Sequence, residues 1–122
     1  MNEIKKSERL EHALSYWKHE TSGDLQGVLD HYAEDATFKA PGYDLSGKQE
    51  IKKFYETIMG SYATMKVEDL RTVEKGDDVV VEFGFNFERH NGEKGYAEGC
   101  NVFTIKDQQI KRVRAYFNPS EY

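Results

Sequence analysis

The chain has 122 residues, which fits a single domain, 1–122, with one hydrophobic core. Its formal net charge of −5, with both signs interspersed, offers no broad basic surface for nucleic acid. No apolar run approaches the roughly 20 residues of a membrane span, and the N-terminal residues lack the apolar stretch of a signal peptide. Because Cys100 is the only cysteine, no internal disulfide can form, and a cytoplasmic location is the expectation.

The first part of the sequence predicts two helices. One covers about 7–21, where apolar residues recur at helical spacing: Leu10, Ala13, Leu14 and Trp17. Gly23 interrupts that pattern, and Asp24 suits the N-cap of a second helix. The expected buried stripe of this second helix is Leu25, Val28, Leu29 and Tyr32.

A short strand and a third helix are predicted next. The strand covers 36–40 and ends at Pro41-Gly42, so residues 43–45 are expected to form a loop. Ser46 to Gln49 matches a capping box, with Gln49 three residues after Ser46. The helix that follows ends near Gly60, and its apolar stripe is Ile51, Phe54, Tyr55 and Ile58.

The second half predicts four long strands, over 65–74, 78–90, 96–106 and 109–117. Their separators are plausible hairpin turns: Lys75-Gly76-Asp77, Asn91-Gly92 and Asp107-Gln108. Alternation is clearest in the second of these strands, whose apolar face is Val79, Val81, Phe83, Phe85 and Phe87. Helices followed by strands predict an α+β domain with the helices on one face of an antiparallel sheet.

The order of elements and several local patterns together resemble the nuclear transport factor 2-like superfamily, and within it the SnoaL-like proteins and ketosteroid isomerases. The patterns are Gly23-Asp24, Tyr32 to Pro41, Gly47 with Ile51 to Tyr55, and Arg114 to Pro119. The resemblance covers nearly the whole chain. It implies a cone, in which a strongly curved, mainly antiparallel sheet wraps around three N-terminal helices and leaves a pocket at its open end. Since this superfamily is functionally mixed, the fold does not settle the function.

The isomerase resemblance implies polar groups inside that pocket. The family's oxyanion tyrosine lies seven residues before the Gly-Asp turn, which is Tyr16 here, and two tyrosines connected to it correspond to Tyr32 and Tyr55. The second oxyanion donor of the family is an aspartic acid, and its place holds Asn101, whose amide carries N–H donors. A structural role is the alternative: the three tyrosines satisfy one another, and Asn101 bonds Tyr16 or a trapped water.

The family's general base has no counterpart at its usual positions. The residue before Pro41 is Ala40, and the place after the terminal Tyr-Phe pair, acidic in some SnoaL-like cyclases, holds Asn118. Asp44, near the expected pocket mouth, is the remaining candidate, although a solvated aspartate with a pKa of about 3.9 is a weak base.

The predicted ligand-binding set joins the polar candidates to the expected cavity wall: Tyr16, Tyr32, Phe38, Ala40, Tyr55, Phe83, Phe87, Asn101, Phe103, Val113 and Phe117. The four histidines share no metal-binding spacing, so neither a metal nor a cofactor is expected: His12, His19, His31 and His90.

Three functions remain open. The first is a domain that binds a small hydrophobic or carbonyl-bearing molecule without strong catalysis. The second is an isomerase or polyketide-cyclase-type enzyme acting on a small polycyclic or carbonyl-bearing substrate, with Tyr16 and Asn101 polarising its oxygen. The third is an assembly domain with an incidental cavity. A homodimer is expected in each case, joined through the sheet face that carries Val80, Val102 and Tyr116.

Overall fold

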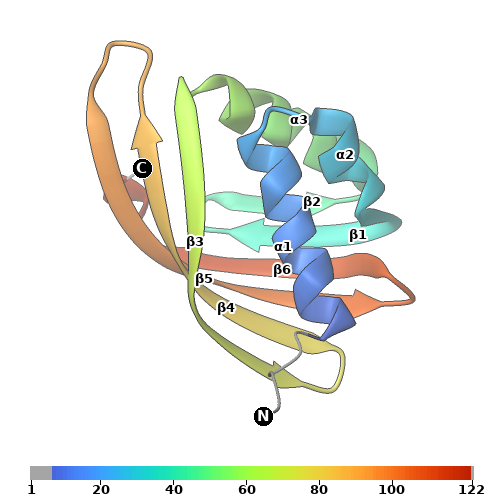
Figure 1. Ribbon diagram of the computed structural model, residues 1–122. Helices are drawn as coiled ribbons and strands as arrows, with labels where there is room; N and C mark the ends of the chain where they lie inside the picture. The colour runs from blue at the N-terminus through green and yellow to red at the C-terminus, as the bar shows by residue number, and fades with distance from the viewer. Residues whose placement is uncertain (1–6, 122) are drawn as a thin grey trace.

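The computed structural model describes residues 7–121, which form three helices and six strands (Figure 1). The helices are α1 (Glu8–Thr21), α2 (Leu25–Asp30) and α3 (Lys48–Gly60). The strands are β1 (Tyr32–Ala40), β2 (Tyr43–Ser46), β3 (Thr64–Lys75), β4 (Asp78–Glu88), β5 (Lys94–Lys106) and β6 (Gln109–Phe117), and a 3₁₀ turn follows at Pro119–Glu121. The predicted α+β class is therefore confirmed.

The six strands make one open sheet in the order β2-β1-β6-β5-β4-β3. All neighbouring strands run antiparallel except β1 and β6, which are parallel. The sheet is strongly curved, and the three helices lie in its hollow (Figure 1). This mainly antiparallel, curved sheet around three N-terminal helices is the predicted cone.

Side-chain caps fix the starts of the first two helices. The Ser7 hydroxyl group accepts a hydrogen bond from the Leu10 amide at 3.0 Å, and the Asp24 carboxylate accepts one from the Gly27 amide at 2.9 Å. Each cap satisfies an amide that has no partner inside its helix. The predicted role of Asp24 as an N-cap is confirmed.

The second helix is shorter than predicted and does not include Tyr32. That helix ends at Asp30, and Tyr32 opens β1, which therefore begins four residues earlier than predicted. Tyr32 pairs with Ile110 of β6, and the Ile110 amide donates to the His31 carbonyl at 2.8 Å. Pairing with a distant strand, which local helical spacing cannot reveal, has overridden the helical pattern here.

Residues 43–45 form strand rather than the predicted loop. They belong to β2, which pairs with β1 across a tight turn at Pro41-Gly42, so that Ala40 faces Tyr43. Gly42 has a φ of 84°, a conformation that glycine adopts without steric cost.

The predicted capping box at Ser46 to Gln49 does not form. Ser46 pairs with Thr37 in the sheet, and Gly47 is the N-cap of α3 without a side-chain hydrogen bond. Glu50, not Gln49, reaches back and accepts from the Ser46 amide at 3.0 Å.

Candidate functional site

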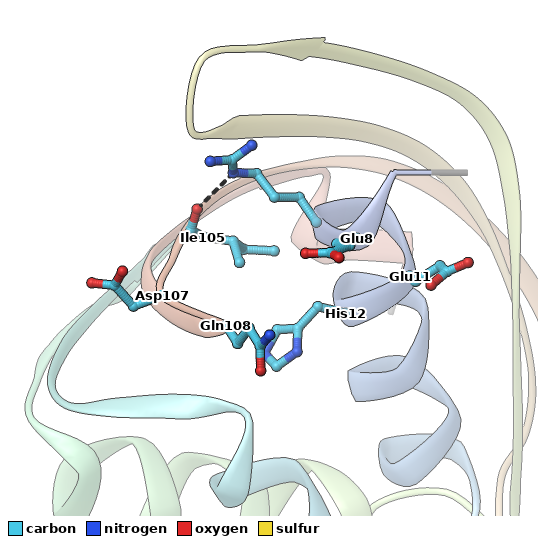
Figure 2. A pocket seen from close by; sticks show the side chains of 7 residues that line it. Glu8, Glu11, His12, Ile105, Asp107 and Gln108 are labelled. Atoms are coloured by element: carbon cyan, nitrogen blue, oxygen red, sulfur yellow. Dashed lines mark hydrogen bonds between the residues drawn. The ribbon is translucent and has the colours of Figure 1, made fainter. Parts of the chain in front are cut away.

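Two hollows of residues 7–121 are large enough to consider, and the first is a polar groove beside the start of α1 (Figure 2). Its cavity volume is about 750 Å³, and charged or polar groups line most of it. Arg9 is already engaged there, with the Asp77 carboxylate at 2.7 Å and the Ile105 carbonyl at 2.9 Å. His12 is engaged as well, through the His31 carbonyl at 3.1 Å. Because this hollow is mainly polar and both of its basic side chains already have partners, it is the poorer candidate for a small, mainly apolar ligand.

The second hollow is a pocket of about 370 Å³ between the helices and the concave face of the sheet. It receives side chains from α1, from α3 and from all six strands, and most of them are aromatic or aliphatic. Its size lies within the range of about 300–1,000 Å³ that is typical of small-molecule sites. A few polar or charged side chains enter this mainly apolar lining, among them Tyr16, Glu20 and Asn101.

Six residues of the predicted ligand-binding set line this pocket: Tyr16, Phe38, Tyr55, Phe83, Asn101 and Phe117. The other five are buried in the core around it: Tyr32, Ala40, Phe87, Phe103 and Val113. Asp44 lies on β2 with an exposed side chain, paired with Lys39, and it is not among the lining residues.

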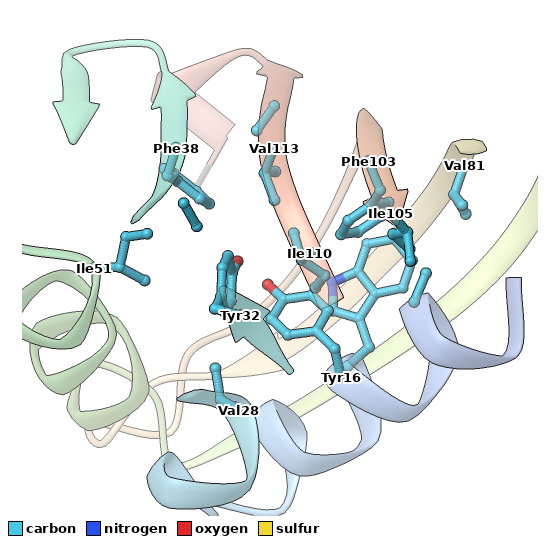
Figure 3. Packing of buried hydrophobic residues seen from close by; sticks show 14 of the residues in the cluster. Tyr16, Val28, Tyr32, Phe38, Ile51, Val81, Phe103, Ile105, Ile110 and Val113 are labelled. Carbon is cyan, nitrogen blue, oxygen red and sulfur yellow. The ribbon is translucent and has the colours of Figure 1, made fainter. Parts of the chain in front are cut away.

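The three tyrosines form a chain of hydrogen bonds. The Tyr55 hydroxyl oxygen lies 2.5 Å from that of Tyr16 and 2.6 Å from that of Tyr32. Figure 3 shows Tyr16 reaching from α1 toward Tyr32 on β1. Burial raises the pKa of all three phenols, so each keeps its proton at neutral pH.

The number of hydroxyl protons determines what the three hydrogen-bonded tyrosines can offer a ligand. Two hydrogen bonds among three hydroxyl groups use two of the three protons. When Tyr32 donates to Tyr55 and Tyr55 donates to Tyr16, the third proton remains on Tyr16. Since Tyr16 lines the pocket and Tyr32 does not, that order presents one phenol donor to the cavity.

Asn101 is a buried polar side chain without a partner. It lies on β5 between Val81 and Ala115 of the neighbouring strands, and 5% of its surface is exposed. Within residues 7–121, its Oδ1 is the one fully buried side-chain nitrogen or oxygen that lacks a hydrogen bond. A buried acceptor without a partner costs about 1–3 kcal/mol, and here it lines the pocket. The bond between Asn101 and Tyr16, one of the two structural alternatives, is not formed.

Glu20 is the functional candidate that the sequence analysis missed. It lines the pocket from α1, four residues after Tyr16, and its exposure is intermediate. Burial of the carboxyl group raises the pKa of Glu20 to about 7, while hydrogen bonding to the Tyr16 phenol acts in the opposite direction. The sequence signal for Glu20 was its spacing from Tyr16, because residues four apart on a helix share a face.

Arg89 brings a positive charge to the same pocket. Its guanidinium group lies over the rings of Tyr62 and Phe87, with centroid distances of 5.4 and 5.0 Å, and it approaches Glu93 at 3.9 Å. Such cation–π contacts hold the group beside aromatic faces. Neither Arg89 nor Tyr62 follows a recognisable sequence pattern, since both lie at the ends of elements.

Three histidines that are scattered in the sequence meet between α1 and α2. The ring centroid of His31 lies 4.6 Å from that of His12 and 5.2 Å from that of His19. The two ring nitrogens of His31 bond the Gly27 carbonyl at 2.6 Å and the Ser15 hydroxyl at 2.9 Å. Across residues 7–121, no group of three or more histidine, cysteine or acidic side chains is arranged to hold a metal ion. No helix of this part of the chain is both long and apolar enough to cross a membrane.

Solved structures with the same fold are numerous and distant in sequence. A putative polyketide cyclase from Xanthomonas campestris pv. campestris has a TM-score of 0.84 at 23% identity, covering 93% of each chain. The Δ5-3-ketosteroid isomerase from a Mycobacterium species has a TM-score of 0.82 at 20% identity, covering 95% of this chain and 97% of that one. At these identities the similarity establishes the fold alone.

A third similar structure carries no assigned activity. It is an NTF2-like protein of unknown function from Burkholderia pseudomallei, with a TM-score of 0.84 at 18% identity over 95% of both chains. No curated protein gives a significant sequence match. The SnoaL-like domain model matches residues 13–113, which is most of the chain. The chain therefore belongs to the SnoaL-like domain family.

Proposed function

We propose that this domain binds a small, mainly apolar molecule in the 370 Å³ pocket and holds one oxygen of that molecule with Tyr16 and Asn101. A carbonyl oxygen suits the pair, because the Tyr16 phenol and the Asn101 amide can both donate to it. The observation that carries the proposal is the unpartnered Asn101 carboxamide, nearly fully buried and facing an apolar pocket.

A burial cost that the protein itself does not offset supports a ligand at this position. The two ends of a carboxamide have nearly the same shape, so rotation presents either the amide or the oxygen to a ligand. The neighbouring phenol donor comes from a different element and reaches the same cavity. A small number of polar groups in an otherwise apolar, aromatic pocket is the usual arrangement that orients a small ligand.

Fluorescence titration with 2-naphthol tests this proposal. The probe is planar and apolar, and its single hydroxyl oxygen ionises to resemble an enolate. Tyr16→Phe and Asn101→Ala should each weaken binding roughly 10-fold or more, because each loses about 1.5–3 kcal/mol of hydrogen bonding to a charged oxygen. Tyr116→Phe, which removes an exposed phenol on the outer sheet face, is the matched control. Unchanged affinity in both pocket variants, or no binding by the wild type, would count against the proposal.

A second candidate is an isomerase or polyketide-cyclase-type enzyme that acts on a carbonyl-bearing substrate in the same pocket. Ala40 and Asn118 are neutral, and this counts against a general base at the family's positions. Glu20 favours the candidate, because a carboxyl group with a pKa near 7 can exchange protons at neutral pH.

A further inference from the structure

We propose that Glu20 is the catalytic proton acceptor of this pocket, and that it takes a proton from the carbon next to a carbonyl group whose oxygen Tyr16 holds. This assignment rests on the binding function proposed above and adds a reaction to it. It places the base on α1, one helical turn after the phenol donor, rather than on the strand position occupied by Ala40.

The helix sets the geometry of the pair. Residues four apart on a helix lie on one face, with Cβ atoms about 5–6 Å apart. Both side chains line the pocket. A carbonyl oxygen bonded to the Tyr16 hydroxyl group is two bonds from its α-carbon, which brings that carbon within reach of a carboxylate one helical turn away.

No other lining residue can do this work. Among the lining residues that the structure describes, Glu20 is the only carboxylate, and there is no histidine. The Arg89 guanidinium group only donates hydrogen bonds, and burial raises the pKa of the lining phenols of Tyr16, Tyr55 and Tyr62, so that they keep their protons. Asp44 is exposed on β2 and outside the lining, so it is poorly placed for a substrate held inside the pocket.

The surroundings of Glu20 suit a group that both takes and returns a proton. Titratable groups face it from several elements: Tyr16 on its own helix, Tyr32 on β1, Tyr55 on α3, Tyr62 after α3, and Arg89 after β4. The phenols are neutral at neutral pH, and burial dominates the pKa of Glu20, at about 7. Both protonation states are therefore populated near pH 7, as a general base that must release its proton requires.

The chemical step needs no added reactant. The Glu20 carboxylate forms an O–H bond with the α-proton as the C–H bond breaks, and that electron pair becomes a carbon–carbon double bond. The carbonyl π electrons move onto the oxygen, whose negative charge Tyr16 and Asn101 stabilise by hydrogen bonding. In a β,γ-unsaturated ketone the product of this step is a dienolate. The protonated Glu20 then returns the proton to its γ-carbon, whose new C–H bond uses the electron pair of the β,γ double bond, while the oxygen electrons re-form the carbonyl group and the enolate double bond shifts to the α,β position.

The test uses cyclohex-3-enone, a small ketone whose isomerisation to the conjugated enone is followed by absorbance. Wild type, Glu20→Gln and Glu20→Asp are compared with Glu11→Gln, which removes an exposed carboxylate from the same helix. Glu20→Gln should lower kcat/KM by about 10²–10⁴-fold, the usual contribution of a general base, and Glu11→Gln should leave it unchanged. Glu20→Asp should retain part of the rate, because the carboxylate remains but withdraws by one methylene.

The pH profile separates the base role from a merely structural one. In the wild type, kcat/KM should rise with pH through about 7 as Glu20 ionises, and this step should be absent in Glu20→Gln. A rate that falls through the same range would identify the protonated acid as the active form and overturn the proposal. Equal rates in wild type and Glu20→Gln, or no wild-type turnover, would overturn it too.

Binding of 2-naphthol, measured on the same samples, distinguishes the two proposals. Glu20→Gln should still bind the probe, since Tyr16 and Asn101 are intact. If the wild type binds the probe through those two residues but shows no isomerisation that depends on Glu20, the reaction is wrong and the binding function stands. If the wild type does not bind it, both proposals fail together.

Discussion

The hydroxyl oxygens of Tyr16 and Tyr55 lie 2.5 Å apart, so a residue of α1 and a residue of α3 hold each other at the wall of the pocket. Neither phenol depends on a loop for its position. Tyr55 also bonds Tyr32, so the Tyr16 phenol at the pocket wall is supported by a second and a third element. A hydrogen-bond donor that is fixed before a ligand arrives loses little entropy on binding, which favours a precise site.

Removing the middle hydroxyl group of the chain should destabilise the protein. Tyr55→Phe leaves two buried phenols, Tyr16 and Tyr32, without their shared partner. We expect the free energy of unfolding to fall by about 1–3 kcal/mol, the cost of unsatisfied buried groups. Urea denaturation measures it, with Tyr96→Phe as the control, because the Tyr96 bond to Glu98 is exposed. Equal stability of the Tyr55→Phe variant and the wild type would show that the hydrogen bonds among the three tyrosines contribute nothing to the free energy of unfolding.

Ionisation of Glu20 should lower the free energy of unfolding as the pH rises. Its folded pKa of about 7 lies above the ordinary value of 4.5, so its neutral form favours the folded state below pH 4.5, and this stability is lost as the pH rises through 7. Converted directly, this pKa shift corresponds to about 3 kcal/mol in the free energy of unfolding. Because the Glu20 side chain is partly exposed, solvent screening reduces the expected effect to about 1–2 kcal/mol. Glu20→Gln should therefore be more stable than the wild type at pH 8 and nearly equal at pH 4. Urea denaturation at both pH values checks this, and a variant less stable at pH 8 would contradict it.

The histidine cluster should act in the opposite direction. Burial, together with the charges of His12 and His19, lowers the pKa of His31 below 6.5. The unfolded chain therefore takes up the proton first, and stability falls as the pH drops through 6.5, levelling off below the folded pKa. His31→Gln should remove this loss, whereas His90→Gln, at an exposed site, should keep it. Urea midpoints between pH 8 and 5 give the slope, and identical slopes in the two variants would rule out His31 as its source.

Elements whose pattern repeats along the chain could be predicted from the sequence. The apolar alternation from Val79 to Phe87 and the turn at Asp107-Gln108 predicted β4 and the hairpin between β5 and β6 correctly. Tyr32 could not be placed, because its strand forms only by pairing with β6, which lies far along the chain. The loop predicted at residues 43–45 failed for the same reason, since β2 depends on β1.

The candidate site also has residues that the sequence could predict and one that it could not. The resemblance to ketosteroid isomerases pointed to Tyr16, Tyr55 and Asn101, and all three side chains line the pocket. Glu20 was missed, because the resemblance pointed to the positions of Ala40 and Asn118, and the alternative base, Asp44, was suggested by its expected place at the pocket mouth. Helical spacing from Tyr16 was the available clue, but spacing alone does not distinguish a pocket carboxylate from a surface one.

The outer face of the sheet leads us to expect a homodimer. Val80 lies opposite Val102 there, and Tyr116 lies beside Cys100 with 55% of its surface exposed. Covering such apolar side chains with a second copy removes them from water. Light scattering should give about 28 kDa, twice the 14.1 kDa of one chain. Tyr116→Lys should shift the protein toward monomer, whereas Asp44→Lys at the sheet edge should not. A monomeric wild type at high micromolar concentration would refute this expectation.

Substitution of Asn101 should have opposite effects on ligand binding and on protein stability. If its carboxamide serves a ligand, the folded protein gains nothing from it and carries the cost of the unpartnered Oδ1. Asn101→Leu keeps a similar shape and removes that atom, so the free energy of unfolding should rise by about 1–2 kcal/mol. The same variant should bind 2-naphthol at least roughly 10-fold more weakly. Asn86→Leu, at an exposed position on β4, is the control and should change neither quantity by much. A destabilised Asn101→Leu would show instead that the side chain supports the fold, because only a structural partner makes its loss costly.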